Sequence, residues 1–543
     1  MKVKSAKAIR FVVATLAVWT VLAVIGALMA PPWQVRPYTD HLVPDTPDTA
    51  IVSTRSGGGT PIGTYAVRES TVTVPLTDTV SVQAIVREPV GAPEGRPAVL
   101  MLHGAGTGRA DEVYGDIAPQ LASAGIVTMV PDKRLDNYGL LHRDYVGMAH
   151  DYEQELDVLR AMPGVDPGRT GVYAESEGTW ISSVMTAERP DLAFSIIVSA
   201  PVYSGRLQMT AAATTYFADT GVPDAIRADI PKLAMLDFSL VRLDYADFDA
   251  LPNYARLTQP ALVVYGTLDP SMPIEQGALE IRNRAWSGAG NGNVTLRYYA
   301  TNHQLRTGSR ISEPDLPLDA DYTRDLAAWI SGVAAGTTAG EWRTPMTAGA
   351  QPNQEFAVPQ SGAMASGPLS LHSLTSLAVL MAGGPALLLL AGIMTATAAL
   401  TRKRAAWRRE ATQLAGAAGT DVRPEPGFGR GTATRLATRL AALGGGTAAA
   451  LALTAGYLGL MVTKTLRLEP DPPLFGGGWI MMRCLSVAVA ALWALVLLRL
   501  RDARRDRHDR YGSHRFDRAV AALTVAGAAL TTGALAFWGM FAL

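Results

Sequence analysis

Five long runs of apolar residues stand out along the chain, one near the N-terminus and four in its last third. The first run, Ile9–Ala30, is about 22 residues long and carries no charge after Arg10. At a rise of about 1.5 Å per residue, a helix of that length crosses a hydrocarbon layer of about 30 Å. The hydropathy pattern therefore predicts five transmembrane helices. The later four are expected at Leu374–Leu400, Ala441–Val462, Trp479–Leu498 and Ala519–Phe541.

The first apolar run has two interpretations, an uncleaved anchor or a cleaved signal peptide. The run is long for a signal peptide, and Leu28, Met29 and Ala30 make a poor small-x-small cleavage site. We therefore expect residues 1–30 to be an N-terminal transmembrane anchor, with a cleaved signal peptide as the alternative.

Between the apolar runs, the pattern changes to short strands that alternate with helices. A hairpin is expected first, from two β-rich runs, Ser70–Val74 and Val80–Val86, with a turn between them. Alternation of strands with helices then predicts an α/β domain, with a mostly parallel sheet covered on both faces. The further strands are expected at Ala98–Leu102, Ile126–Val130, Thr170–Tyr173, Phe194–Val198, Ala261–Tyr265 and Val294–Tyr299, and the helices at Tyr114–Ala124, Asp144–Met162 and about 178–188.

Composition suggests the domain boundaries. Residues 31–66 and 336–370 are rich in Pro, Thr and Gly and are expected to be linkers. The α/β domain is then expected over 67–335 and a four-helix membrane domain over 371–543. Residues 201–259 interrupt the alternation after the sixth core strand, which predicts an inserted cap.

Charge is unevenly distributed, although the net charge of the chain is zero. Residues 31–370 hold 24 Lys and Arg against 39 Asp and Glu, while the rest of the chain holds 24 against 9. An acidic soluble part offers no basic face to nucleic acid, so a nucleic-acid partner is excluded. A basic membrane part is typical of a protein with loops in the cytoplasm.

The loops between the apolar runs predict the orientation. Residues 401–440 carry nine Lys and Arg and residues 499–518 carry eight, whereas the loop 463–478 carries two. By the positive-inside rule, the two basic loops and the N-terminus are cytoplasmic. The α/β domain and the C-terminus are then expected outside the cytoplasm of a multi-pass protein of the cell membrane.

Few residue types remain for other chemistry. The single cysteine, Cys484, lies in an apolar run, so we expect neither an intramolecular disulfide nor a thiol mechanism. No CxxC or HExxH pattern occurs, and we expect no metal and no cofactor. The apolar runs contain almost no charge, which favours an anchoring and packing role. A platform for a lipid substrate or for a partner protein is the alternative.

One sequence pattern suggests a nucleophile. A strand is followed by Ala174-Glu175-Ser176-Glu177-Gly178 and then by a helix. A serine nucleophile projects from a tight strand-to-helix turn that needs small residues on both sides. Ala174 stands where glycine is usual, which is a departure. The alternative for Ser176 is an ordinary helix N-cap.

Two further residues follow in the order that a Ser-Asp-His triad on such a sheet requires. Asp269 follows the strand run Ala261–Tyr265, and His303 follows Val294–Tyr299. Alone, each would be a turn or loop residue, but the order and the strand ends favour a triad. His303 is expected to accept the proton of Ser176, and Asp269 to orient and stabilise the imidazole.

The developing oxyanion needs two aimed N–H donors. We expect one from the backbone of Glu177 and the other from the loop His103-Gly104-Ala105-Gly106, with Ala105 as the donor. The alternative for this loop is an ordinary glycine-rich turn.

Two carboxylates, Glu175 and Glu177, flank the nucleophile. They would raise the pKa of His303 or disfavour anionic substrates if they face the site. Alternatively they make helix contacts without a catalytic role.

Together these motifs resemble the α/β-hydrolase superfamily. The matching runs are HGAG at 103–106, DKR at 132–134, AESEG at 174–178, GTLDP at 266–270 and NH at 302–303. The pattern is most similar to prolyl-oligopeptidase-like and dienelactone-hydrolase-like esterases and covers about 240 residues. The chain has no room for the propeller of a true prolyl oligopeptidase, which argues against an endopeptidase.

The resemblance implies a serine hydrolase that cleaves an ester or thioester through an acyl-enzyme. With the membrane helices, we expect its substrate to be a small-molecule or lipid ester outside the cytoplasm and its surroundings to include membrane lipids. Protein partners are not predicted. Acyl transfer to cell-envelope lipid or sugar esters and peptide hydrolysis are alternatives within the fold. A non-catalytic scaffold or sensor is the alternative from another class.

Overall fold

The computed structural model describes residues 2–360, 370–415, 430–505 and 515–542. The chain divides into two compact units, which are described separately. The membrane-helix unit comprises Met1–Pro32, Phe217–Leu240 and Ala363–Leu543, and the sheet unit comprises Trp33–Tyr216 and Val241–Gly362.

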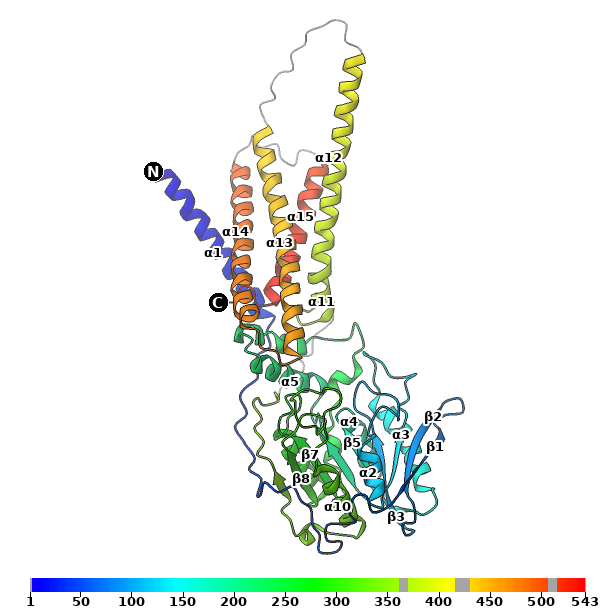
Figure 1. The fold of residues 1–543 in the computed structure, drawn as a ribbon. Coiled ribbons are helices and arrows are strands. Elements are labelled where there is room, and N and C mark those ends of the chain that lie inside the picture. The colour runs from blue at the N-terminus through cyan, green and yellow to red at the C-terminus, as the bar shows by residue number, and fades with distance from the viewer. Residues whose placement is uncertain (1, 361–369, 416–429, 506–514, 543) are drawn as a thin grey trace. The chain divides into compact units, whose positions relative to one another are not determined.

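The sheet unit is built on one nine-stranded sheet with the order β1-β2-β4-β3-β5-β6-β7-β8-β9 (Figure 1). β1 pairs antiparallel with β2, β2 pairs antiparallel with β4, and every later neighbour is parallel. This arrangement is the α/β-hydrolase fold, so the predicted fold class is confirmed. The strands are β1 Val67–Pro75, β2 Ser81–Pro89, β3 Arg96–Leu102, β4 Val127–Pro131, β5 Val165–Glu175, β6 Ser195–Val198, β7 Ala261–Gly266, β8 Val294–Tyr299 and β9 Thr347–Gly349.

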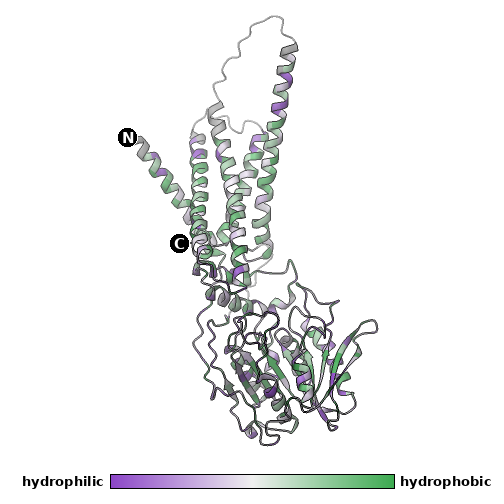
Figure 2. Cartoon of the chain, in the orientation of Figure 1, coloured by the Kyte–Doolittle hydropathy of each residue, from purple (hydrophilic) through white to green (hydrophobic). Residues whose placement is uncertain are grey.

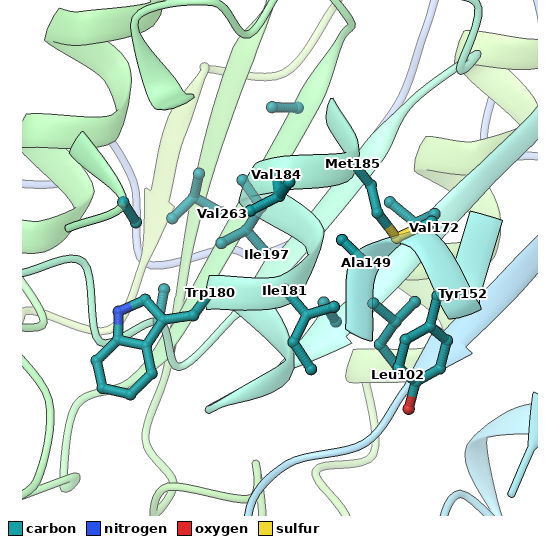
Figure 3. Close-up of a cluster of buried hydrophobic side chains, with 14 of the residues drawn as sticks. Leu102, Ala149, Tyr152, Val172, Trp180, Ile181, Val184, Met185, Ile197 and Val263 are labelled. Carbon is teal, nitrogen blue, oxygen red and sulfur yellow. The ribbon is translucent and has the colours of Figure 1, made fainter. Parts of the chain in front are cut away.

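Helices cover both faces of this sheet because its central strands are apolar on both sides. All residues of β4, β6, β7 and β8 are buried. One core cluster joins the sheet to α3, α4 and α9, and a second joins it to α2 and α10. Figure 3 shows part of the first cluster, with Ile181, Val184 and Met185 of α4 beside Val172 and Ile197 of the sheet. The helices are α2 Ile117–Ser123, α3 Tyr145–Arg160, α4 Gly178–Glu188, α9 Gln276–Ala289 and α10 Tyr322–Ala334.

Parts of both segments expected to be linkers pack on the sheet unit. The buried carboxylate of Glu275 accepts hydrogen bonds from the backbone N–H groups of Leu42 and Gln354, at 2.7 and 2.5 Å. Arg297 donates from Nε to the carbonyl of Thr49 at 2.9 Å. The short strand β9 also lies in the second segment, and we did not predict it. Composition alone missed these contacts, because they depend on partners more than 200 or about 80 residues away.

An insertion follows β6, where the cap was predicted, and it is divided between the two units. Its first helix, α5 Gly205–Asp219, begins in the sheet unit, and residues Phe217–Leu240 belong to the membrane-helix unit. Residues 241–259 return to the sheet unit. The other short helices of the insertion are α6 Asp224–Arg227, α7 Ile230–Ala234, η1 Asp244–Asp247 and α8 Leu251–Tyr254.

The membrane-helix unit contains long helices whose residues are mostly hydrophobic (Figure 2). Among the described residues, five segments are long and apolar enough to cross a membrane. They are Ala6–Leu28, Leu374–Arg409, Leu436–Thr465, Pro473–Asp502 and Arg515–Phe537. They agree in number and place with the five predicted helices. The elements are α1 Lys2–Leu28, α11 Leu374–Ala378, η3 Val379–Gly383, α12 Gly384–Ala415, α13 Arg430–Thr465, η4 Pro473–Gly477, α14 Gly478–Arg505 and α15 Arg515–Phe537.

Glycines allow some of these helices to approach closely. A Cβ atom at Gly527 of α15 would lie 2.9 Å from the carbonyl oxygen of Gly384, and one at Gly446 would lie 2.5 Å from Leu492. Gly456 and Gly459 have open space instead. The glycines therefore serve helix packing at some positions and not at others.

The insertion residues Phe217–Leu240 pack against one end of this unit. Val222 and Ile226 join a buried cluster that includes Tyr457, Phe475 and Phe541. In addition, Lys232 donates to the carbonyl of Phe537 at 2.9 Å and to Asp229 at 2.6 Å, which caps the C-terminus of α15. The backbone of Asp237 pairs with that of His372 and Leu374, ahead of α11.

Candidate active site

Ser176 lies at the turn between β5 and α4 with a φ of 54°, a left-handed conformation that is strained for a residue with a side chain. Its backbone N–H donates to Val198 at 2.9 Å. A Cβ atom at Gly178 would lie 2.8 Å from the carbonyl oxygen of His103, so the turn requires glycine there. Ala174 is fully buried in β5, between neighbouring strands, and its methyl group fits where glycine was expected.

Asp269 and His303 form the predicted pair. His303 Nδ1 lies 2.7 Å from Asp269 Oδ2, and the Asp269 side chain is fully buried. The other oxygen of Asp269 accepts the N–H of Ser271 at 2.7 Å. Ser199 Oγ donates to the carbonyl of His303 at 2.7 Å. Both members of the pair are therefore fixed by the ends of β6, β7 and β8.

Ser176 and His303 are brought to the same edge of the sheet. The backbone N–H of Ser176 donates a hydrogen bond to Val198. The hydroxyl of the next residue, Ser199, donates one to the backbone carbonyl of His303. Among the hydrogen bonds of the described residues, none joins Ser176 Oγ to His303 Nε2. Such bonds are often long in unliganded enzymes and tighten with substrate.

The charge state of His303 is tuned by two carboxylates. Burial lowers the pKa of His303, but the charge of Asp269, its hydrogen bond and the charge of Glu175 raise it by more. The pKa therefore lies above the ordinary histidine value. Glu175 contributes least to this rise, after the charge and the hydrogen bond of Asp269, and its catalytic role stays a prediction.

The predicted oxyanion loop lies against the nucleophile. A Cβ atom at Gly104 would lie 3.4 Å from Ser176 Cβ, and Gly106 has a φ of 81° that favours glycine. In the part of the chain that the structure describes, the backbone N–H groups of Ala105 and Glu177 have no protein acceptor. Both N–H groups are therefore available as donors, and their role as the oxyanion hole stays a prediction.

His103 has a structural place in this loop. Its ring lies buried, with Nε2 at 2.5 Å from the carbonyl of Pro131. Burial, together with the charge of Lys133, lowers the pKa of His103 to about 4. The ring is therefore neutral at pH 7 and donates to Pro131.

Glu177 points away from the reacting atoms into a network that we did not predict. Its carboxylate is buried and accepts from Tyr138 at 2.8 Å and from Tyr145 at 3.0 Å. Lys133 and Arg143 pair with it at 3.2 and 2.5 Å. The lysine of the DKR run was the available signal. Its partner lies 44 residues away, and no local pattern joins the two.

The loop after β7 is also held by residues that we did not predict. Gln208 of α5 donates to the carbonyl of Ser271 at 2.6 Å, and the hydroxyls of Tyr216 and Ser271 lie 3.1 Å apart. Ser271 in turn supports Asp269. The insertion therefore positions the acid of the pair.

In the described ranges, no group of three or more His, Cys, Asp or Glu could hold a metal ion. Cys484 lies in α14, in the other unit.

Comparisons with known proteins concern the fold. No family model matches the chain, and no curated protein sequence matches it. Among solved structures, an esterase of Pyrococcus furiosus is similar at 18% identity and a TM-score of 0.33, over 49% of this chain and 90% of that chain. Brefeldin A esterase, a bacterial homologue of human hormone-sensitive lipase, is similar at 17% identity and a TM-score of 0.34, over 60% of this chain and 86% of that chain. A protein described as a dienelactone hydrolase from Klebsiella pneumoniae is similar at 13% identity and a TM-score of 0.33, over 49% of this chain and 95% of that chain.

Proposed function

We propose that the protein is a membrane-anchored serine hydrolase that cleaves an ester or thioester outside the cytoplasm. One observation carries this proposal. Ser176 lies at a strained strand-to-helix turn after β5, and the hydrogen-bonded pair of Asp269 and His303 lies after β7 and β8 of the same sheet. That arrangement suits nucleophilic acyl transfer.

The reaction would proceed in two steps. His303 Nε2 takes the proton of Ser176 as Oγ attacks the acyl carbon, and the same proton then passes to the leaving alcohol or thiol. Water next attacks the acyl-enzyme, again losing its proton to His303, and the free acid leaves as Ser176 is reprotonated. Asp269 keeps the imidazole oriented and stabilises its charged form. The N–H groups of Glu177 and Ala105 stabilise the oxyanion in both steps.

The extracytoplasmic location is supported by the charge of the loops and by the packing of the insertion. Residues Phe217–Leu240 of the insertion pack at the C-terminal ends of α13 and α15 and at the start of α11. The Arg-rich loops join the opposite ends of these helices. By the positive-inside rule those opposite ends are cytoplasmic. This location favours lipid or cell-envelope esters as substrates.

A fluorophosphonate probe tests the nucleophile in the full-length protein. Labelling of the intact protein that is lost in Ser176→Ala supports the proposal. Absence of labelling in the intact protein contradicts it, and favours a scaffold or sensor. For orientation, a periplasmic-type reporter fused after residue 420 is expected to be inactive and one after residue 300 active.

Acyl transfer and amide hydrolysis use the same triad and differ in the acceptor or the bond cleaved. Product analysis separates them. With an alcohol acceptor present, free acid as the product supports hydrolysis, and a new ester indicates acyl transfer. Cleavage of a peptide amide in preference to the ester with the same acyl group would indicate a peptidase.

A further inference from the structure

Lys133 makes two hydrogen bonds that together join the nucleophile turn to the oxyanion loop. Its Nζ donates to Gly104 O at 2.7 Å and to Glu177 Oε2 at 3.2 Å. The Lys133 side chain is fully buried, and that of Glu177 is 3% exposed. A buried ammonium group costs free energy unless it is paired, so a buried lysine with two such partners is an unusual feature beside a catalytic serine.

The bond to Gly104 bears directly on an oxyanion donor. Gly104 C=O and Ala105 N–H belong to one peptide unit, and in a planar trans peptide they point in opposite directions. When Lys133 holds the oxygen on one side, the Ala105 N–H is directed to the other side. A cation on the carbonyl also polarises the peptide and strengthens the N–H as a donor.

The bond to Glu177 links this donor to the other one. The backbone N–H of Glu177 is the second predicted donor, and its side chain holds Lys133. That side chain is itself held by Arg143, Tyr138 and Tyr145. A displacement of either donor would therefore disturb the other.

The network also has a charge consequence. Two cations, Lys133 and Arg143, face one carboxylate, Glu177, next to the turn where the oxyanion forms. Both cations contact the ring of Tyr138, with Lys133 Nζ 4.6 Å and Arg143 Cζ 5.0 Å from its centroid. A fixed positive charge in a water-poor region stabilises a developing negative charge more than it does a neutral ester.

We infer that Lys133 and Glu177 form an oxyanion clamp, which aligns the N–H donors of Ala105 and Glu177 on the transition state. This inference rests on the proposed hydrolase function. Lys133 is a positioning residue that acts through the Gly104–Ala105 peptide. The Glu177 side chain positions Lys133, while the Glu177 backbone touches the substrate.

The first test compares three variants of the full-length protein on a p-nitrophenyl ester. Lys133→Met keeps the approximate length of the side chain and removes its charge and both of its hydrogen bonds. We expect kcat to fall about 100- to 1,000-fold, with a much smaller change in KM. Arg143→Met also removes a cation from Glu177, but it leaves the bond of Lys133 to Gly104 in place. We therefore expect a smaller fall in kcat. Arg134→Met, whose side chain pairs with Asp136 and Asp151, controls for a change in the same loop and is expected to keep kcat.

A second readout separates positioning from simple stability. A trifluoromethyl ketone with the same acyl group places a negative oxygen in the oxyanion hole. We expect Lys133→Met to lose affinity for it by about the same factor as kcat, while KM for the ester stays nearly constant. A purely structural role would lower the melting temperature and the active fraction without this parallel loss.

The outcomes distinguish the two proposals. If the wild-type protein neither hydrolyses esters nor reacts with the fluorophosphonate, the hydrolase function fails and the clamp fails with it. If the wild type is active but Lys133→Met retains kcat, or loses no more than Arg143→Met, the clamp alone is wrong. If Lys133→Met does not fold, Glu177→Gln decides. It keeps the backbone donor and the side-chain shape, and an unchanged kcat in it overturns the clamp.

Discussion

The buried carboxylates of the two units have partners at different distances along the chain. In the sheet unit, buried carboxylates pair with groups from distant parts of the chain, as Asp269 does with His303 and Glu177 does with Lys133. In the membrane-helix unit, the buried carboxylate of Asp229 pairs with Lys232, three residues later, and the buried hydroxyl of Thr531 donates to the carbonyl four residues earlier in its own helix, at 2.8 Å. Long-range pairs fix the geometry between elements, and local bonds only satisfy a side chain.

This difference predicts where mutations act. A catalytic site needs several elements to be held in register, so changes to the long-range pairs of the sheet unit should alter turnover. Helices in lipid associate mainly through close packing, so changes in the membrane-helix unit should alter stability. The Asp229–Lys232 pair of the insertion is a buried ion pair in the helix unit and tests where this contrast breaks down.

The largest effect is expected from Asp269→Asn. The amide cannot hold the imidazole in its productive tautomer, and kcat should fall about 10,000-fold. The shape is retained and Ser271 keeps an acceptor, so the melting temperature should change little. Asp157→Asn, at a largely exposed carboxylate, is the matched control and should keep kcat. A large loss of stability in Asp269→Asn, with turnover of the folded protein preserved, would contradict the assignment.

The next largest effect is expected from Lys232→Met, which leaves Asp229 as a buried unpaired carboxylate. Removing one partner of such a pair costs about 3–5 kcal/mol of unfolding free energy, and the pair also caps α15. Thermal unfolding in detergent measures the loss, and the double variant with Asp229→Asn should recover much of it. If turnover per folded molecule also falls in Lys232→Met, the insertion transmits strain to the catalytic residues and the contrast between the units is incomplete.

The pH dependence of the same pair has a definite sign. Burial raises the pKa of Asp229 to about 6, despite the charge and hydrogen bond of Lys232. The folded state therefore binds this proton more tightly than the unfolded state, whose carboxylate titrates near pH 4. The contribution of Asp229 to stability should be complete below about pH 4 and should be lost as pH rises through about 6. Unfolding across this range, with Asp229→Asn as the control, checks the prediction.

A smaller effect is expected from Gly527→Ala. The added methyl group would meet Gly384 O and Leu388 at 2.9 Å, and overpacking of this kind costs about 1–3 kcal/mol. Gly459→Ala adds the same atom where there is open space, and should change stability by less than about 0.5 kcal/mol. Equal melting temperatures for the two variants would show that close packing of α12 and α15 is not what stabilises the unit.

The smallest effect is expected from Glu175→Gln. Removal of this charge lowers the pKa of His303, so neutral imidazole, the form that accepts the proton of Ser176, persists to lower pH. The acid limb of the kcat/KM profile should move to lower pH, with a gain in rate of less than about tenfold there. Burial raises the pKa of Glu175 itself, so the gain should diminish where Glu175 is already protonated. An unmoved acid limb would show that Glu175 does not influence the base.

Sequence reasoning worked where the signal was local. Apolar runs predicted the strands β3 to β8. The Ser-x-Gly pattern at Ser176, followed by an acid and a histidine at later strand ends, predicted Asp269 and His303, which the structure brings together. It did not locate Lys133, Arg143 and their tyrosines, because a contact between side chains 30 to 45 residues apart leaves no periodic signature. The division of the insertion was missed for the same reason, since Val222 and Ile226 contact residues more than 200 positions later.

The loop between β4 and α3 has an inner and an outer side. Its Tyr138 and Arg143 donate hydrogen bonds to Glu177, whereas its Leu135 and Leu140 are 54% and 78% exposed. Mutant libraries confined to these two leucines would vary the outer surface of the loop and leave its hydrogen bonds to Glu177 intact. A nucleophile turn grafted into another scaffold would need more than its serine. Without the lysine, the arginine and the two tyrosines that hold Glu177, the graft would lack the contacts that position the turn.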